Sequence, residues 1–128
     1  MRILLAGGGS GGHVTPLKAI ARQLLLQKRK VDIFVITDRG FYGHTKDIFA
    51  DMPDVRINKI FAGKLRRYHS KSILWHVIHL PTLLKNLRDL IYIAIGALQS
   101  IWLILRNRPD VVFCKGGFVC VPVGYLAH

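Results

Sequence analysis

A glycine-rich stretch that ends in a histidine is the first feature of this sequence that could do chemistry. Positions 7–13 read GGGSGGH, so five glycines and Ser10 precede His13. Residues without a Cβ let several backbone N–H groups approach one anion, and a helix that begins behind them adds the positive end of its dipole. An imidazole can act as a general base or donate a hydrogen bond to a phosphate, so His13 is a candidate for either role. The stretch predicts an anion site; the alternatives are a glycine turn without a ligand and a histidine that caps the helix.

A second glycine pair follows a later apolar run. Gly116 and Gly117 stand between Lys115 and Phe118, directly after Val111–Cys114. Ligands of α/β folds bind at the carboxyl ends of parallel strands, so two such loops on neighbouring strands would converge on one anion. Lys115 would add positive charge there. The two loops together predict the site more strongly than either loop alone.

The residues alone leave the kind of anion open. Gly7, Gly9 and Gly12 satisfy the G-x-G-x-x-G pattern of dinucleotide-binding folds, and Asp38 stands where such folds place the acid that binds ribose. Two features count against a dinucleotide. The helix is expected to start about three residues after the motif instead of within it, and a pyrophosphate cradle does not need His13. A P-loop is excluded because no Gly-Lys-Ser/Thr follows the glycines.

The elements that must position these loops follow from the pattern of apolar residues. Arg2–Ala6 and Val31–Thr37 are short apolar runs, which predicts buried strands. Apolar residues recur between them at helical spacing, with Thr15 as the expected N-cap, Pro16 at the first helical position and Lys28–Lys30 at the carboxyl end. Strand, helix and strand at this spacing form a βαβ unit. We therefore predict an α/β fold, a Rossmann-like parallel sheet with flanking helices.

The rest of the chain continues this pattern without an internal domain boundary. The further elements that it predicts are a loop and a short helix in Asp38–Pro53, strands in Val55–Phe61 and Val111–Cys114, and the start of a helix in Val119–His128. We expect one domain over residues 1–128.

The segment Ser72–Arg106 is helical in pattern and unusually apolar, with an interruption at Pro81. Its most apolar part, Leu90–Leu105, has 16 residues, fewer than the roughly 20 that a membrane-spanning helix needs. Most of the segment is therefore expected to be a crossover helix that is buried against the sheet. Because it is apolar nearly all round and has basic neighbours, part of it is also expected to form a membrane patch. The predicted patch consists of Trp75, Leu83, Ile95, Trp102, Arg66, Arg67 and Lys71.

Composition limits the kinds of partner. The 128 residues include 19 Lys and Arg against 7 Asp and Glu, a net charge of +12, and 51% of them are hydrophobic. The apolar fraction excludes intrinsic disorder, and the charge indicates an anionic partner: nucleic acid, anionic lipid or a phosphorylated substrate. Nucleic acid is not expected, because no recognised nucleic-acid-binding motif is present. Cys114 and Cys120 lack the spacing of a zinc site and are expected to be free thiols, so no metal is predicted.

Three motifs resemble a known family. GGGSGGHVTP (7–16), GKLRRY (63–68) and PDVVFCKGGFVCVPVG (109–124) are similar to the N-terminal domain of the MurG family of bacterial N-acetylglucosaminyltransferases. The resemblance spans nearly the whole chain in the right order and spacing. Ser10 stands where the family usually has Thr, a departure that keeps the hydroxyl.

This resemblance implies the N-terminal half of a two-domain GT-B glycosyltransferase, inverting, metal-independent and without a cofactor. The family transfers N-acetylglucosamine from UDP-GlcNAc to a muramyl pentapeptide on undecaprenyl diphosphate, which converts lipid I to lipid II in peptidoglycan synthesis. It works as a peripheral protein on the cytoplasmic face of the bacterial cell membrane, and its N-terminal domain carries the acceptor site. His13 matches the family's candidate base. The substrate-binding candidates that the resemblance implies are Gly9, Ser10, Gly11, Gly12, Gly116, Gly117 and Phe118.

The family's donor-binding residues would lie past His128. We therefore expect a fragment, or one half of a split enzyme, that lacks its C-terminal donor domain and does not transfer sugar alone. Three alternatives remain. One is the stand-alone acceptor half of a two-subunit enzyme such as the dolichol-linked N-acetylglucosaminyltransferase. The others are an NAD-type oxidoreductase domain and a non-catalytic module that binds membrane or nucleic acid.

Overall fold

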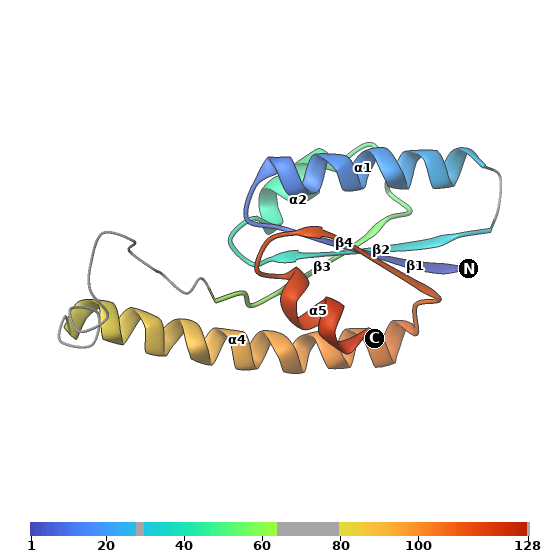
Figure 1. Cartoon of the computed structure of the whole chain (residues 1–128). Helices are drawn as coiled ribbons and strands as arrows, with labels where there is room; N and C mark the ends of the chain where they lie inside the picture. The colour runs from blue at the N-terminus through green and yellow to red at the C-terminus, as the bar shows by residue number, and fades with distance from the viewer. Residues whose placement is uncertain (28–29, 64–79, 128) are drawn as a thin grey trace.

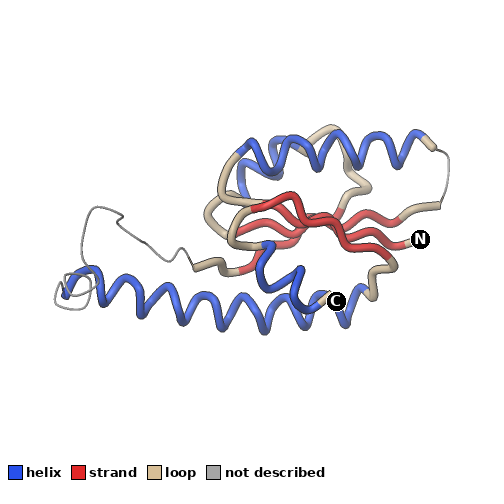
Figure 2. Tube along the Cα trace, viewed as in Figure 1, coloured by secondary structure: helices blue, strands red, loops and turns tan. Residues whose placement is uncertain are grey.

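The structure, a computed structural model of the 128-residue chain, describes residues 1–27, 30–63 and 80–127. It consists of one parallel sheet with helices on both faces (Figures 1 and 2). The elements in chain order are β1 (Arg2–Gly7), α1 (Gly11–Leu26), β2 (Asp32–Asp38), α2 (Tyr42–Ile48), β3 (Arg56–Ile60), α4 (Leu80–Asn107), β4 (Val111–Gly116) and α5 (Cys120–Leu126). The predicted α/β class and each of the four predicted strands are confirmed.

The sheet order is β3-β2-β1-β4, with every neighbouring pair parallel. Strand β1 therefore lies between β2 and β4, with Ile3 opposite Ile33 on one side and Val111 on the other. Because all four strands run the same way, the loops that follow β1, β2 and β4 leave the sheet at one edge. This topology places both glycine loops side by side.

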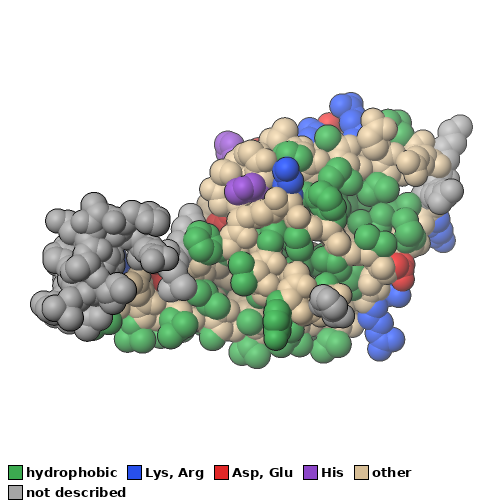
Figure 3. All heavy atoms as spheres, in the orientation of Figure 1, with side chains coloured by type: hydrophobic (Ala, Val, Ile, Leu, Met, Phe, Trp, Pro, Cys, Tyr) green, Lys and Arg blue, Asp and Glu red, His purple; other side chains and the backbone are tan. Residues whose placement is uncertain are grey.

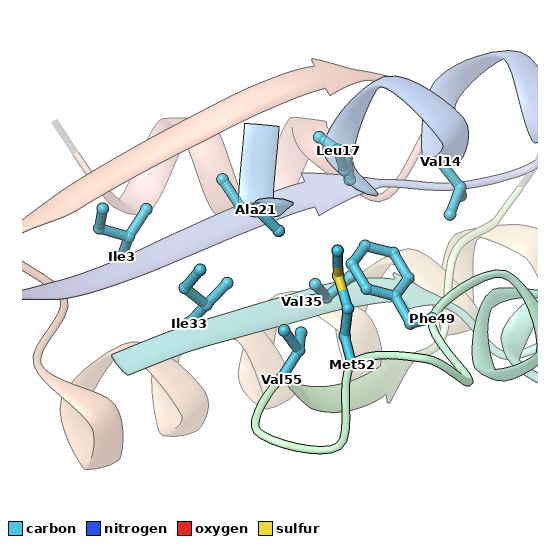
Figure 4. Packing of buried hydrophobic residues seen from close by; sticks show 10 residues of the cluster. Ile3, Val14, Leu17, Ala21, Ile33, Val35, Phe49, Met52 and Val55 are labelled. Atoms are coloured by element: carbon cyan, nitrogen blue, oxygen red, sulfur yellow. The ribbon is translucent and has the colours of Figure 1, made fainter. Parts of the chain in front are cut away.

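The core consists of two apolar layers, one on each face of the sheet. Ile3 and Leu5 of β1 pack with helix α1 and with the segment that follows α2. Figure 4 shows Ile3 with Leu17 and Ala21 of α1 and with Met52 of that segment. Leu4 and Ala6, which alternate with them, pack on the opposite face with α4 and α5. A strand buried on both faces must be apolar at every position, which is why β1 has no polar alternation.

Helix α1 begins earlier than the sequence predicted. Ser10, with φ −162° and ψ 158°, is its N-cap, so the predicted cap at Thr15 is wrong and Pro16 lies inside the helix. The helix begins before Thr15 because Val14 is already part of its buried apolar side, together with Leu17 and Ala21. The helix ends at Leu26, before the three basic residues that were expected at its carboxyl end.

Helix α4 differs most from expectation. Pro81 lies in its first turn, where a missing N–H costs nothing, so this proline does not interrupt the helix. Between residues 83 and 107, Leu103 is the one large apolar side chain that is buried, and the expected burial against the sheet is wrong. The exposed apolar residues that share its outer face are Leu84, Leu87, Ile91, Ile95, Leu98, Trp102 and Leu105, called here the α4 stripe. Hydrophobic side chains follow α4 along its outer side in Figure 3.

The inner side of α4 carries small and polar residues, among them Asp89, Gly96 and Ser100. A Cβ on Gly96 would overlap the carbonyl oxygen of Phe61, so this glycine lets the helix backbone touch the segment after β3. The backbone N–H of Phe61 donates to Gln99 Oε1 at 2.8 Å. The helix is thus attached by close backbone contact and hydrogen bonds, which leaves its apolar residues on the outside.

Residues Leu83–Asn107, 25 in number, form a helix that is long and apolar enough to cross a membrane by length and composition. Only 22% of its most apolar window is buried inside the protein. The estimate from Leu90–Leu105, which made the apolar segment too short, is therefore wrong.

Candidate functional site

The first glycine loop connects β1 to α1 and is held by an acid from the neighbouring strand. Gly9 adopts a left-handed backbone conformation, with φ +83°, which favours glycine. Its N–H donates to Asp38 Oδ2, and the N–H of Phe41 donates to Asp38 Oδ1 at 3.1 Å. Asp38 is 7% exposed. This carboxylate at the end of β2 therefore fixes the loop that follows β1.

The second glycine loop lies directly against the first. Gly116 and Gly117 have φ values of +143° and +89°. The N–H of Gly8 donates to the carbonyl oxygen of Gly116 at 3.4 Å, and a Cβ on Gly117 would overlap the carbonyl oxygen of Gly8. The two loops that the sequence singled out are thus in direct main-chain contact, and a side chain at position 117 would not fit there.

His13 lies in the first turn of α1, half-buried, with its ring between the two loops. Its Nδ1 is 3.0 Å from the carbonyl oxygen of Gly8 and 3.2 Å from Ser10 Oγ. A Cβ on Gly116 would lie 3.2 Å from its Nε2. A carbonyl oxygen can only accept, so a neutral imidazole that donates Nδ1–H to Gly8 keeps its lone pair on Nε2. The ring thus presents a basic nitrogen on the side of the second loop.

A cavity of about 330 Å³ opens between the loops. Its lining residues are Gly8, Gly9, Ser10, His13, Asp38, Ala62, Gly117, Phe118 and Val119. Gly11 and Gly12, also predicted to bind substrate, form the first turn of α1 and do not line it. Gly116 lies against the ring of His13 but does not line the cavity. Lys115 is exposed and does not line the cavity either.

The geometry changes the argument about a dinucleotide. Helix α1 begins at Gly11, within the glycine motif, so the late start that counted against a dinucleotide is not present. A different observation takes its place. Both oxygens of Asp38, the expected ribose ligand, already accept backbone hydrogen bonds from Gly9 and Phe41. Sequence reasoning assigned Asp38 to a ribose from its place in a motif and missed that it holds the loop after β1.

Both cysteines are free, as predicted, and one lies against the site. Cys120 Sγ accepts from the N–H of Gly116 at 3.3 Å and is 3.2 Å from the carbonyl oxygen of Ala6. A hydrogen bond from Cys114 lowers the pKa of Cys120 to about 7, helped by backbone hydrogen bonds and by the nearby His13 and opposed by burial. The same pairing raises the pKa of Cys114. Sequence reasoning missed this pair, since the two cysteines are six positions apart, one in β4 and the other in α5.

In the part of the chain that the structure describes, no three His, Cys, Asp or Glu side chains are grouped to hold a metal ion. Of the predicted membrane patch, Leu83, Ile95 and Trp102 are exposed on α4. Ile95 and Trp102 are seven residues apart and share the face of the α4 stripe. Trp75, Arg66, Arg67 and Lys71 lie outside the described residues.

Comparison with known proteins supports the resemblance. Residues 3–128 match the family model described as glycosyltransferase family 28 N-terminal domain. The UDP-N-acetylglucosamine--N-acetylmuramyl-(pentapeptide) pyrophosphoryl-undecaprenol N-acetylglucosamine transferase of Streptococcus pyogenes serotype M12 is 37% identical over 94% of this chain and 29% of its own length. The enzyme of the same name from Legionella pneumophila strain Corby is 36% identical over 94% of this chain and 28% of its own length.

A solved structure, MurG of Acinetobacter baumannii, has the same fold, with a TM-score of 0.69 over 98% of this chain and 32% of that one at 19% identity. The chain thus spans less than a third of the length of the relatives it matches.

Proposed function

This chain belongs to the family of glycosyltransferase family 28 N-terminal domains, and on that premise we propose that it is the acceptor-binding domain of an N-acetylglucosaminyltransferase. The reaction is the transfer of N-acetylglucosamine from UDP-GlcNAc to a muramyl pentapeptide on undecaprenyl diphosphate, the step that the names of its relatives describe. The observation that carries the proposal is the contact between the two glycine loops, with His13 between them, at the cavity that follows β1 and β4.

The backbone of these loops is suited to the diphosphate of the acceptor. The N–H groups of Gly8 and Gly9 already donate to Gly116 and Asp38, so the groups that remain for an anion are those at the start of α1, after its N-cap Ser10. The first N–H groups of a helix have no partner within it, and they carry the positive end of its dipole. The net charge of +12 strengthens that attraction over a longer range.

His13 is suited to act as the general base. Its Nε2 takes the proton from the acceptor hydroxyl as that oxygen attacks the anomeric carbon of the donor sugar. The bond between that carbon and the phosphate oxygen of UDP breaks from the opposite side, so the configuration inverts and UDP leaves with the bonding electrons. The hydrogen bond from Nδ1 to Gly8 orients the ring and stabilises the imidazolium that forms.

The residues that bind the donor nucleotide are assigned to the part of the relatives that this chain does not cover. The relatives are more than three times its length, and we assign UDP-GlcNAc binding to their remaining part. Residues 1–128 alone are therefore expected to bind acceptor and to be inactive in transfer.

The α4 stripe and the positive charge support peripheral attachment to an anionic membrane on the cytoplasmic side. Asp89 is 3% exposed on the inner side of α4, and Gly96 contacts Phe61. A helix that crossed the bilayer would give up these contacts and carry Asp89 into hydrocarbon. Attachment along the membrane surface keeps both the contacts and the apolar stripe in favourable surroundings.

A titration tests the acceptor function. We expect the 128-residue chain to bind a short-chain prenyl-diphosphate-linked N-acetylmuramyl pentapeptide in calorimetry and to show no measurable heat with NAD. Binding of NAD, with no binding of the acceptor analogue, would establish the dinucleotide alternative instead.

A further inference from the structure

An apolar cavity of about 190 Å³ lies beside the cavity of the glycine loops. Its lining residues are Phe61, Ala62, Gly63, Ile93, Phe118, Val121 and Pro122. They come from the segment after β3, from α4, from the loop before α5 and from the first turn of α5. Apart from Gly63, which has no side chain, all of these residues have apolar side chains.

The two cavities are adjacent, because Ala62 and Phe118 line both of them. Phe118, 47% exposed, thus has the loop cavity on one side and the apolar cavity on the other. A ligand held at the glycine loops by its anionic group would meet only apolar surface if it extended past Phe118. Such a ligand must be anionic at one end and hydrocarbon beyond it.

Val121 is 66% exposed, so the apolar cavity is open to water on at least one side. Apolar surface that stays in contact with water is unfavourable and gains free energy when a hydrocarbon covers it. The sugar and peptide of an acceptor are poor occupants, since their hydroxyl and amide groups would lose water without gaining a hydrogen bond from these side chains.

We propose that the apolar cavity binds the first isoprene units of a prenyl diphosphate whose diphosphate lies at the glycine loops. The inference rests on the proposed acceptor function and adds to it a subsite for the lipid chain. Helix α4 contributes Ile93 to the cavity wall and carries the α4 stripe on its outer side. One helix therefore borders both the start of the hydrocarbon chain and the surface assigned to the membrane.

Calorimetric titration of the 128-residue chain with geranyl diphosphate, inorganic pyrophosphate and geraniol tests the subsite. We expect geranyl diphosphate to bind about tenfold or more tightly than pyrophosphate, because the cavity covers part of its hydrocarbon. Geraniol should bind more weakly than geranyl diphosphate, because it has no anion for the loops.

Val121→Gln places a polar side chain in the cavity without changing net charge, and it should remove the advantage of geranyl diphosphate while leaving pyrophosphate affinity unchanged. Val111→Gln is the matched control, since Val111 is 47% exposed at the start of β4 and lines neither cavity. Equal affinity for geranyl diphosphate and pyrophosphate, or equal effects of the two variants, would overturn the subsite and leave the acceptor function standing. Absence of binding by both diphosphates would overturn the subsite and the proposed acceptor function together.

Discussion

The ring of His13 is oriented by the first glycine loop, which is also proposed to bind the acceptor diphosphate. The carbonyl oxygen of Gly8 and the hydroxyl of Ser10 both lie within hydrogen-bonding distance of Nδ1. A hydrogen bond at Nδ1 fixes the orientation of the imidazole ring and therefore the direction in which Nε2 points. A general base needs such a fixed direction toward the proton that it removes.

His13→Ala should therefore lower kcat by about 10²-fold or more and leave KM for the acceptor within a few-fold. The measurement is steady-state transfer by a two-domain enzyme made by joining this chain to the remaining part of the Streptococcus pyogenes relative. Ser10→Ala is the control, with a smaller loss, because the Gly8 contact remains. A change confined to KM would assign His13 to substrate binding instead.

Gly11 and Gly117 offer a matched comparison within the glycine loops. A Cβ on Gly117 would overlap the carbonyl oxygen of Gly8, whereas a Cβ on Gly11 meets no atom within 4 Å. We expect Gly117→Ala to separate the loops and weaken pyrophosphate binding about tenfold or more, since φ +89° also disfavours alanine. Gly11→Ala should bind pyrophosphate normally and gain a few tenths of a kcal/mol or more in stability as a helical residue. Equal losses in calorimetry would show that close contact between the loops is not what matters.

Cys120 is a free thiol beside the glycine loops that a thiol reagent can label. With a pKa of about 7, its thiolate fraction should rise through neutral pH, and alkylation by iodoacetamide should follow with a midpoint near pH 7. Cys114→Ala removes the hydrogen bond that lowers this pKa, so the rate at pH 7 should fall about fivefold if the pKa rises by one unit and about tenfold for each further unit. Mass spectrometry after a timed pulse identifies which cysteine reacts. Faster labelling of Cys114 in the unmodified chain would contradict the assignment.

At the scale of the element, α4 is attached by its small and polar side and exposes its apolar side. The amino-acid sequence showed the apolar residues but could not show which of them face the protein. That choice depends on a tertiary contact, the close approach of Gly96 to Phe61, which leaves no trace in the helical period. The start of α1 was misplaced for a related reason. Thr15 and Pro16 are good N-terminal residues locally, but burial of Val14 extends the helix past them.

The α4 stripe should bind the chain to anionic vesicles. We expect co-sedimentation with phosphatidylglycerol vesicles, little with phosphatidylcholine vesicles, and partial release by salt. Leu98→Glu should weaken binding about tenfold or more, because it removes an apolar side chain that is 67% exposed on the stripe. Leu26→Glu is the control, with the same charge change at a residue 66% exposed on α1, across the sheet from α4 (Figure 1).

The basic part of the predicted patch has a separate test. Reversal of Arg66, Arg67 and Lys71 to Glu should weaken binding to anionic vesicles by roughly 1 kcal/mol or more per residue and leave the thermal unfolding temperature unchanged. Equal binding of the unmodified chain to both kinds of vesicle would mean insertion of the apolar helix without a role for charge.

At the scale of the whole molecule, the meeting of the two glycine loops followed from strand order and could be predicted from the sequence. Two apolar runs that each end in glycines, in a parallel sheet, bring their loops to one edge, and β1 and β4 are indeed neighbours. What could not be predicted were the contacts across that edge. Asp38 was assigned to a ribose because its place matched a motif, whereas its oxygens hold Gly9 and Phe41. Side-chain pairings of this kind depend on distances of a few ångströms, which spacing along the chain does not encode.

Gly116 and Gly117 hold the second loop against the first through main-chain atoms and left-handed backbone angles. An inhibitor that bound these main-chain groups in the loop cavity would leave few amino-acid replacements that could weaken its binding. Any amino-acid replacement of a glycine introduces a Cβ, and at Gly117 a Cβ would overlap the carbonyl oxygen of Gly8. Resistance would then have to arise away from the loops, for instance at Phe118, or by export of the compound. A compound designed for this cavity should therefore draw its affinity from the main chain and as little as it can from Phe118.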